Sequence, residues 1–333
     1  MDSIPFVGVI KSTPEDFRVI EYMDFQLSGE GEHVWIYLRK RLLNTQDVQK
    51  SIARLAQVKR SDVGYSGLKD KIAVTEQWFS VYFPKGDEPD WLALNNDHIK
   101  IIHISRHDKK LRVGTHKYNF FSIIVKDCCF SNIDKLYLQL ESIKNNGFLN
   151  IFASQRFGNN NRNYEKALKW ITGNLKVKSQ KDKGFLLSVL RSYIYNEYIS
   201  YRKEKGLLHT VLLGDIVGFP GANSWFSIDK DNINDAQKRL EDGEIVIGGV
   251  LYGRAKKLHL KDEAKQLLDA IIFKFPWARE LLNYGVESSF RAVSIVPSEL
   301  NYSYNDQDKT LALSFSLPKG GYATALLAQI SID

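Results

Sequence analysis

The sequence predicts an α+β fold in which strand-forming and helix-forming segments occupy different parts of the chain. Alternating strand patterns separated by turns fill roughly the first 130 residues, helical patterns dominate the middle, and strand patterns return near the C-terminal end. With 333 residues, and about 100–200 residues in a typical domain, the chain is expected to form about two domains. We therefore predict a β-rich domain built from both ends of the chain, with a mostly helical insertion between them.

The first half is predicted to hold several strands and one clear helix. The helix spans residues 45–57, where Thr45 can cap the first turn and apolar residues recur on one face. Alternation of apolar and polar residues predicts the strands. They are expected at 6–22 (two strands around a turn at Thr13-Pro14), 33–41, 75–83 and 109–125 (two pieces around Gly114).

The second half changes to helical periodicity and then returns to strands. Gly147 and Gly206 are each placed to end a helix, since glycine readily adopts the left-handed conformation found after a helix C-terminus. The expected helices are 131–147, 184–205, 262–274 and a closing helix at 322–330, and the expected strands are 290–297 and 309–318.

Charge and composition suggest a polyanionic partner without establishing one. The net charge is +7, the pI is about 9.1 and aromatic residues make up 12% of the chain. Basic clusters occur at 39–41, 106–117 and 254–257, and the second of them is followed by Tyr118, Phe120 and Phe121. Cations for phosphates beside rings for bases are typical of RNA binding, although a basic surface over an aromatic core gives the same pattern.

Several classes of protein are not indicated. The two cysteines, Cys128 and Cys129, are adjacent, which disfavours a disulfide framework and suggests a reducing cytoplasm. No signal-peptide pattern and no apolar stretch of membrane-spanning length is present. Metal-ligand spacing, a P-loop, a GxGxxG turn and a GxSxG elbow are also missing, so we expect no metal and no small-molecule cofactor.

The segment GYSGLKDKIAVTEQW (64–78) places Asp70 in a glycine-containing loop directly before a predicted strand. A carboxylate on a loop that a rigid element supports is positioned as catalytic groups often are. Cations turned toward it, such as Lys69 and Lys71, would stabilise its ionised form. The alternative is an inert, solvated turn in which these charges merely lie on the surface.

Several segments in order resemble the TruD family of tRNA pseudouridine synthases. GLKDKIAVTEQW (67–78) is similar to the family pattern G-x-K-D-(K/R)-x-A-x-T-x-Q at every specified position. The other similar segments are PEDFRVIE (14–21), VGTHKYNFF (113–121), FASQRFGN (152–159), LLSVLRSYIYNEYISYR (186–202) and FSLPKGGYAT (315–324). The resemblance therefore covers essentially the whole chain.

The resemblance implies conversion of uridine to pseudouridine in tRNA, at position 13 of the D arm, with no cofactor. It implies a pseudouridine-synthase catalytic domain with a mixed, largely antiparallel sheet over 1–144 and 291–333, and an inserted helical domain over 145–290. Asp70 is the implied catalytic carboxylate, which either attacks the ribose anomeric carbon or removes a proton from the neighbouring ribose carbon. The implied substrate contacts are Phe17, Asn119 and Phe315, with Lys11 as a partner of Asp70, Phe121 as a stacking platform and Gln77 as a support for the loop.

The residues alone leave two other functions open. The chain could be an RNA-binding protein or tRNA-folding chaperone in which catalysis is lost or secondary. A glycosidase would need a second acid across from Asp70, and Glu76 is the nearest candidate.

Overall fold

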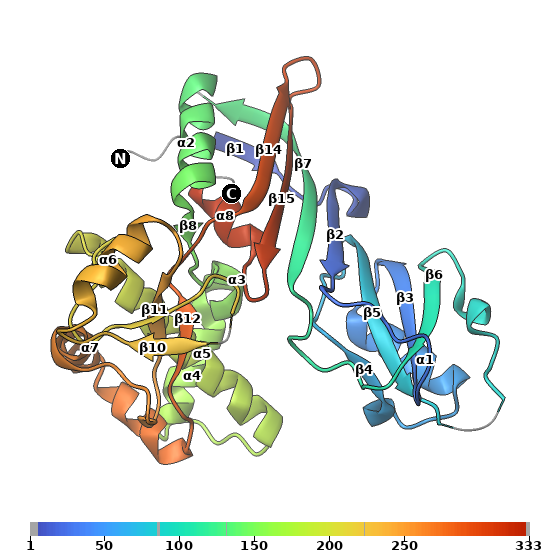
Figure 1. The fold of residues 1–333 in the computed structure, drawn as a ribbon, viewed down its shortest axis with the longest axis horizontal. Helices are drawn as coiled ribbons and strands as arrows, with labels where there is room; N and C mark the ends of the chain where they lie inside the picture. The colour runs from blue at the N-terminus through green and yellow to red at the C-terminus, as the bar shows by residue number, and fades with distance from the viewer. Residues whose placement is uncertain (1–5, 85–86, 131, 223, 331–333) are drawn as a thin grey trace. The chain divides into compact units, whose positions relative to one another are not determined.

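The computed structural model describes residues 6–84, 87–130, 132–222 and 224–330. Contacts divide the chain into two compact units, and most of their helices and strands are labelled in Figure 1. Unit 1 combines residues 1–146, 296–323 and 330–333, and unit 2 combines residues 147–295 and 324–329. Unit 1 thus takes its strands from both ends of the sequence.

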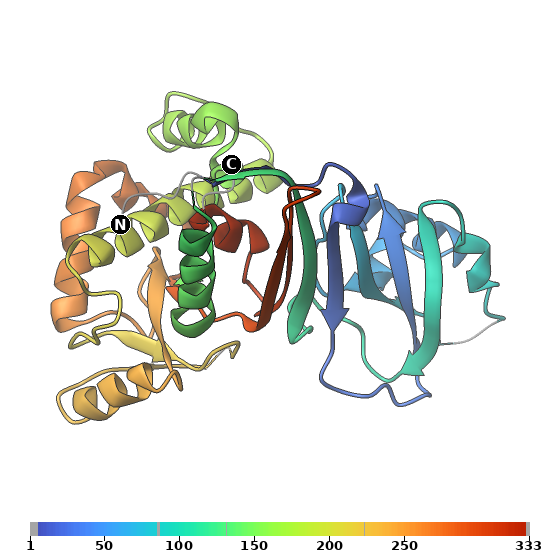
Figure 2. The ribbon, with the colours of Figure 1, turned by 90° about the horizontal axis from the view of Figure 1, so that it is seen from above.

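Unit 1 is built on one sheet. Its strands are β1 (Phe6–Val9), β2 (Phe17–Tyr22), β3 (His33–Arg41), β4 (Val63–Tyr65), β5 (Val74–Tyr82), β6 (Ile99–His107), β7 (Tyr118–Phe130), β14 (Ser298–Asn305) and β15 (Thr310–Pro318). The main path runs β14-β15-β7-β2-β5-β3-β6, while β1 pairs with β7 and β4 with β5 (Figure 2). The β2–β5 pair is parallel, and the other pairs in the described part of the sheet are antiparallel. The predicted α+β fold with a mixed, largely antiparallel sheet is confirmed.

Alternation along the strands gives the sheet of unit 1 two different faces. In β2, Phe17, Val19 and Glu21 are buried, while the residues between them are exposed. The helix α1 (Thr45–Leu55) packs Val48 and Ile52 into a core shared with residues of β3 and β5. The apolar residues of a helix recur about every 3.6 residues and those of a strand every two residues. Each therefore presents one apolar side, and the two sides can share this core.

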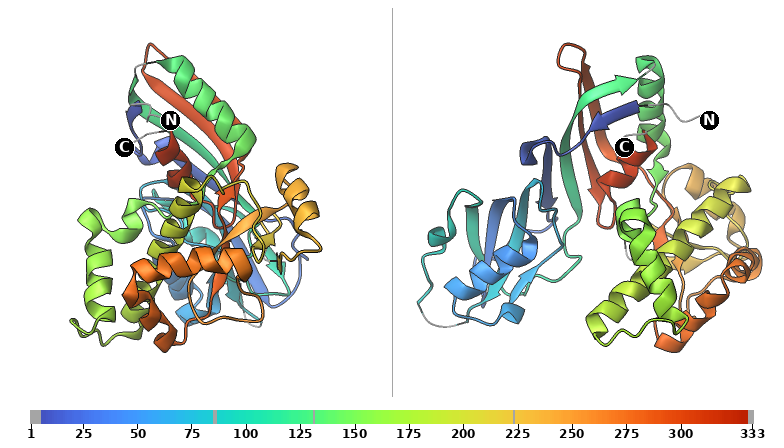
Figure 3. Two further views of the ribbon diagram at one scale, coloured as in Figure 1. Left: turned by 90° about the vertical axis from the view of Figure 1, so that its left-hand side faces the viewer. Right: turned by 180° about the vertical axis from the view of Figure 1, so that it is seen from behind.

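Further helices of unit 1 are short, apart from α2 (Ile133–Asn146). This helix lies along β14, where Tyr302 Oη donates a hydrogen bond of 2.7 Å to Glu141 Oε1 (Figure 3). The 3₁₀ helices of the unit are Pro14–Asp16, Arg60–Asp62 and Trp91–Leu94.

The predicted cap of α1 is wrong by one residue. Asn44 is the cap, and the side chain of Asp47 accepts a hydrogen bond from the Asn44 backbone at 3.3 Å. The hydroxyl of Thr45 instead points to a buried neighbour outside the helix, Gln77. Local sequence allows either residue as a cap, and the structure adds a local contact between Asn44 and Asp47 that Thr45 does not make.

The strand predicted before Gly114 is also wrong. Residues 108–117 form a loop that crosses the β4–β5 pair, where Leu111 N donates to Ser80 Oγ at 2.9 Å. Gly64 in β4 allows this approach, because a Cβ there would lie 2.2 Å from Leu111 O. Gly114 has a left-handed φ of 81°, which breaks the strand pattern. The strand β6 was not among those predicted.

Unit 2 combines helices with a small sheet. Its helices are α3 (Ser154–Phe157), α4 (Arg162–Ile171), α5 (Gln180–Glu204), α6 (Ile233–Glu241), α7 (Asp262–Lys274), most of α8 (Ala323–Gln329) and the 3₁₀ segments Asn159–Asn161 and Pro276–Tyr284. Its strands are β9 (Ile216–Gly218), β10 (Trp225–Ser227), β11 (Val246–Leu251) and β12 (Ser289–Ala292) in the order β10-β9-β11-β12, and the separate pair β8 (Phe148–Leu149) and β13 (Ser294–Ile295). The sequence predicts α5, α7, α8 and the strand region of β12 and β13. It does not predict α3, α4, α6 or the strands β8 to β11.

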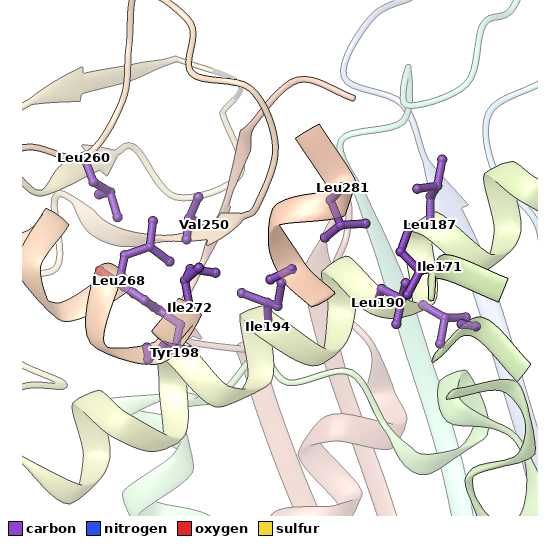
Figure 4. Packing of buried hydrophobic residues seen from close by; sticks show 14 of the residues in the cluster. Ile171, Leu187, Leu190, Ile194, Tyr198, Val250, Leu260, Leu268, Ile272 and Leu281 are labelled. Atoms are coloured by element: carbon purple, nitrogen blue, oxygen red, sulfur yellow. The ribbon is translucent and has the colours of Figure 1, made fainter. Parts of the chain in front are cut away.

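The core of unit 2 is organised around α5, the 25-residue helix. Its buried side chains recur along the helix and meet side chains from α4, α7, β11 and the segment after α7. Figure 4 shows this packing for Leu187, Leu190, Ile194 and Tyr198 of α5 with Ile171, Val250, Leu268, Ile272 and Leu281.

A buried ion pair fastens the end of α5 to the following segment. Arg202 contacts Asp215 through two hydrogen bonds, of 2.8 and 3.0 Å, and both side chains are fully buried. Arg202 also donates to the Tyr198 hydroxyl and to the Thr210 and Leu207 carbonyls. Every charge in this arrangement therefore has partners, which buried charges require.

We expect Asp215→Asn to destabilise unit 2 by about 3–5 kcal/mol, because the guanidinium of Arg202 would stay buried without its carboxylate. Urea unfolding followed by circular dichroism measures the change. The matched control is Asp269→Asn, which removes an exposed ion pair with Lys265 and should cost about 0.5 kcal/mol or less. Equal effects from the two variants would contradict this account of the pair.

Candidate active site

The loop between β4 and β5 presents one carboxylate to solvent. Asp70 has a side chain that is 54% exposed, and its Oδ2 lies 2.9 Å from Lys11 Nζ. The next two residues in the loop are also exposed, and Ala73 is buried as β5 begins. A carboxylate in this position is open to a substrate and already has a cationic neighbour.

Lys11 reaches Asp70 from the segment that links β1 and β2. Its backbone has a left-handed φ of 58°, which is uncommon for a residue other than glycine. Its ammonium lies 4.3 Å from the ring centroid of Phe17, so the cation sits over an aromatic face while it pairs with Asp70. These two contacts hold the side chain of Lys11 in one place.

Lys69 turns away from Asp70 and into the protein. Its ammonium lies 2.8 Å from Glu21 Oε2 and donates to Asn119 Oδ1 at 2.6 Å. Both side chains of this ion pair are buried, so solvent screens the attraction between them little. Burial raises the pKa of the Glu21 carboxyl above its ordinary value, and Lys69 opposes that rise. The expected role of Lys69 as a cation directed at Asp70 is therefore not what the structure shows.

Two buried polar side chains fasten the backbone before Asp70. The hydroxyl of Thr45 accepts from Lys69 N at 2.9 Å and donates to Gln77 Oε1 at 2.9 Å. Gln77 Nε2 in turn donates to Gly67 O at 3.2 Å. The start of α1 and the middle of β5 thus hold the loop from two sides, and Gln77 lies where it supports the loop.

Lys40 holds the backbone of Asp70 itself. This lysine of β3 is fully buried, and its Nζ donates to Asp70 O and to Leu43 O, both at 2.8 Å. Burial lowers the pKa of Lys40 to about 8, while the nearby charge of Asp70 acts to raise it. The contact fixes the main chain at Asp70 and leaves its carboxylate exposed.

A chain of hydrogen bonds joins the loop to Asn119 on β7. Ser66 Oγ lies 2.6 Å from His116 Nδ1 and accepts from His116 N at 2.8 Å. Asn119 Nδ2 lies 3.2 Å from His116 Nε2. Because an amide nitrogen only donates, Nε2 accepts and the ring proton lies on Nδ1. Burial, followed by the charges of Lys69 and Lys319, lowers the pKa of His116 to about 4.

The three phenylalanines expected near the substrate pack against one another. The rings of Phe121 and Phe315 are stacked with centroids 5.4 Å apart, and Phe17 meets Phe121 edge-on at 6.2 Å. Phe17 and Phe315 are essentially fully buried and Phe121 is 7% exposed. They form an apolar layer beneath Lys11, and their contact with a substrate stays a prediction.

Glu76 lies on the other side of β5 from Gln77, which contacts the loop. It accepts hydrogen bonds from Arg39 and from the Tyr37 hydroxyl. This position does not place Glu76 across from Asp70, so the structure disfavours a two-carboxylate glycosidase.

The described residues contain no cluster of His, Cys, Asp or Glu side chains that could hold a metal ion. Likewise, none of the helices in the described ranges is long and apolar enough to cross a bilayer. Cys128 is buried, Cys129 is exposed, and both are free thiols.

The structure adds residues that the sequence did not assign to the site: Lys40, Thr45, Glu21, Ser66 and His116. Lys40 occupies an inward position of an alternating strand, which was the available signal for its burial. The partners of the other residues come from distant segments, and their pattern in the sequence carries no comparable signal.

Comparison with known proteins identifies the class as that of the pseudouridine synthases. The family model described as tRNA pseudouridine synthase D (TruD) matches residues 1–176 and 159–330, and the chain belongs to this family. It is 36% identical over 325 residues to the tRNA pseudouridine synthase D of Histophilus somni, a match that covers 97% of this chain and 94% of that protein. It is 34% identical over 327 residues to that of Proteus mirabilis, covering 97% and 91% respectively.

A solved structure shows the same fold. The putative tRNA pseudouridine synthase D of Methanosarcina mazei superimposes with a TM-score of 0.71, covering 99% of this chain and 94% of that one. Its sequence identity is 19%, so the similarity concerns the fold alone.

The buried state of His116 predicts a pH dependence of stability. Its pKa is about 4 in the folded protein against 6.5 ordinarily, so below pH 6.5 the unfolded chain binds a proton that the folded chain does not. Stability should therefore fall by about 1 kcal/mol per pH unit between pH 6.5 and 4 on account of this residue. We expect urea unfolding of His116→Gln to lack this contribution.

His98→Gln is the control, because His98 is exposed. It should leave the pH dependence unchanged. The prediction is contradicted if His116→Gln and the wild type lose stability equally as the pH falls.

Proposed function

We propose that this protein isomerises uridine to pseudouridine in tRNA, at position 13 of the D arm, with the Asp70 carboxylate and without a cofactor. The observation that carries the proposal is that Asp70 projects from a loop whose backbone is fastened at Lys69 and at Asp70 itself, and that its carboxylate lies beside Lys11. The target position follows from the resemblance of the sequence motifs to the TruD family. A cytoplasmic location is part of the same proposal.

The reaction breaks the bond between the ribose and a nitrogen of uracil and then joins the ribose to a carbon of the same base. Asp70 either attacks the ribose anomeric carbon or removes a proton from the neighbouring carbon. Both routes need an ionised carboxylate and access to the sugar. The 2.9 Å contact with Lys11 balances the negative charge, and the exposure of Asp70 leaves the second oxygen available.

Asn119 is suited to recognise the uracil edge. Lys69 binds its amide oxygen and His116 binds its amide nitrogen, so the orientation of the amide is fixed. The oxygen can accept one further hydrogen bond and the nitrogen can donate one further hydrogen bond. We propose that Asn119 uses these remaining positions to pair with the donor and acceptor groups of uracil.

We propose that Phe17, Phe121 and Phe315 supply the apolar floor of the uridine site. Their mutual packing and the cation over Phe17 support a preformed layer rather than a mobile one. Burial means that a base would meet the edge of this layer unless a ring moves. An apolar surface at this point helps to offset the few kcal/mol that extrusion of a nucleotide costs.

The basic clusters contribute unequally to the proposed tRNA contacts. Arg39 is paired with Glu76, Arg106 with Glu88 and Lys256 with Glu287, so each of these charges is already balanced. Arg112 is exposed in the segment whose Gly114 N–H donates to Ser66 O at 2.7 Å, next to the Asp70 loop. We propose that Arg112 and the exposed Lys71 bind phosphates near the target nucleotide.

We assign the catalytic domain to unit 1 and the inserted family-specific domain to unit 2. The residues proposed for catalysis and uridine binding all belong to unit 1. The contact boundaries, after Asn146 and before Val296, lie near the expected limits of 145–290 for the insertion. Residues 324–329, which the sequence places in the catalytic domain, belong to unit 2.

Asp70→Asn should lower the rate of pseudouridine formation on a tRNA transcript by about 10³-fold or more, because an amide can neither attack carbon nor act as a base. The dissociation constant for tRNA should change by less than about threefold, since phosphate contacts dominate affinity. Mass spectrometry of the digested tRNA measures the product and filter binding measures affinity. Asp97→Asn, at an exposed aspartate in unit 1, should leave both unchanged. A wild-type protein that binds tRNA without forming pseudouridine would instead be an RNA-binding protein.

Lys11→Met should slow product formation by about 100-fold, because the charge that balances Asp70 is lost. Lys11→Arg should retain activity within about tenfold of the wild type, since it keeps the positive charge. Single-turnover rates on the same transcript provide the comparison. Equal rates for the two variants would show that the cation at this position is not needed.

A further inference from the structure

An apolar side chain stands exposed beside the carboxylate. Leu68 lies two residues before Asp70 and is 67% exposed. Single exposed leucines are common on proteins, so exposure alone does not indicate a function. The position of Leu68 within the fastened part of the loop is what separates it from other exposed apolar residues.

Both neighbours of Leu68 are held by buried partners. Gly67 O accepts from Gln77, and Lys69 N donates to Thr45. The side chain of Lys69 is 5% exposed and points inward, whereas those of Leu68 and Asp70 point outward. A leucine whose backbone is fixed in this way would lose little further backbone freedom when it contacts an RNA, so its insertion carries a small entropic cost.

We propose that Leu68 is the wedge that enters the RNA stack in place of the extruded uridine. The proposal rests on the function proposed above. A nucleotide that leaves its stack to reach Asp70 leaves a gap between its neighbours, and apolar side chains inserted between bases stabilise such gaps. Leu68 supplies an apolar group of suitable size within two residues of the carboxylate that must meet the sugar.

Ile72 is the second exposed aliphatic residue of the loop, at 51% exposure. It follows Asp70 in the part of the loop where the chain bends, at residues 71–73. The hydrogen bonds described above fasten Gly67, Lys69 and Asp70 rather than the residues beside Ile72. We therefore assign the wedge to Leu68 and treat Ile72 as the comparison.

The test uses the full chain and two tRNA transcripts. One is the unmodified transcript, and the other carries an abasic nucleotide next to the target uridine, which removes a stacking partner. Leu68→Ala should slow single-turnover product formation on the unmodified transcript by about 10- to 100-fold, the scale of unstacking one base. On the abasic transcript Leu68→Ala should be slower than the wild type by only about threefold or less, because extrusion of the uridine then leaves no gap between two stacked bases.

Leu138→Ala is the matched control, since Leu138 is 71% exposed on α2 of the same unit. It should match the wild type on both transcripts, as should Ile72→Ala. Thermal unfolding by circular dichroism verifies that each variant is folded.

The inference is overturned if Leu68→Ala is as fast as the wild type on the unmodified transcript. It is also overturned if the loss is the same on both transcripts, because Leu68 would then act on the loop rather than on the stack. A larger effect of Ile72→Ala would move the wedge to Ile72. Absence of product from the wild type on both transcripts would instead refute the proposed function, and the wedge with it.

Discussion

The candidate active site depends on the buried contact between Lys69 and Glu21. Lys69 follows Leu68 directly and precedes Asp70 in the loop, so the point at which its side chain enters the protein fixes where its neighbours emerge. Its ammonium reaches both Glu21 on β2 and Asn119 on β7, two strands that pair with each other. A buried ion pair is weak evidence for stability, because desolvation offsets much of the attraction. This ion pair matters because of where it lies. Lys69 connects the loop to the sheet and orients the amide of Asn119, which is proposed to recognise uracil.

Some residues of this region bind the backbone of the loop, and others project their side chains outward from it. Thr45, Gln77 and Lys40 bind backbone atoms of the loop, and each is buried. Asp70 and Leu68 project outward from the backbone that these residues hold. A reactive group must stay within a fraction of an ångström of its working position, and buried hydrogen bonds supply that precision better than a solvated turn does. A loop without regular structure is thus held in place by hydrogen bonds from three buried side chains.

Alternation and helical periodicity predict the fold class, five of the eight α-helices described and about half of the strands, because the sheet of unit 1 and the helices of unit 2 each bury one side. The strands that were not predicted are β4, β6, β8, β9, β10, β11 and β14. The segment before Gly114 was mispredicted because its course depends on Gly64 and Ser80, which lie far away in the sequence. Asp70 is predicted as the catalytic residue from its motif, and that role stays a prediction. The direction of Lys69 could not be predicted, since a lysine beside an aspartate in a loop is usually solvated. The sequence predicts Thr45 as a helix cap because local sequence does not reveal Gln77 as its partner.

The measurement that tests this account most directly removes the buried charge pair while leaving Asp70 in place. In Lys69→Met with Glu21→Gln, the glutamine can still accept the hydrogen bond that Trp78 N donates to Glu21 Oε1, and no unpaired charge stays buried. The account predicts a folded protein that binds tRNA but forms pseudouridine at least about tenfold more slowly than the wild type, because the loop loses its anchor. A folded double variant with the wild-type single-turnover rate would contradict the claim that this pair positions Asp70, the proposed catalytic carboxylate.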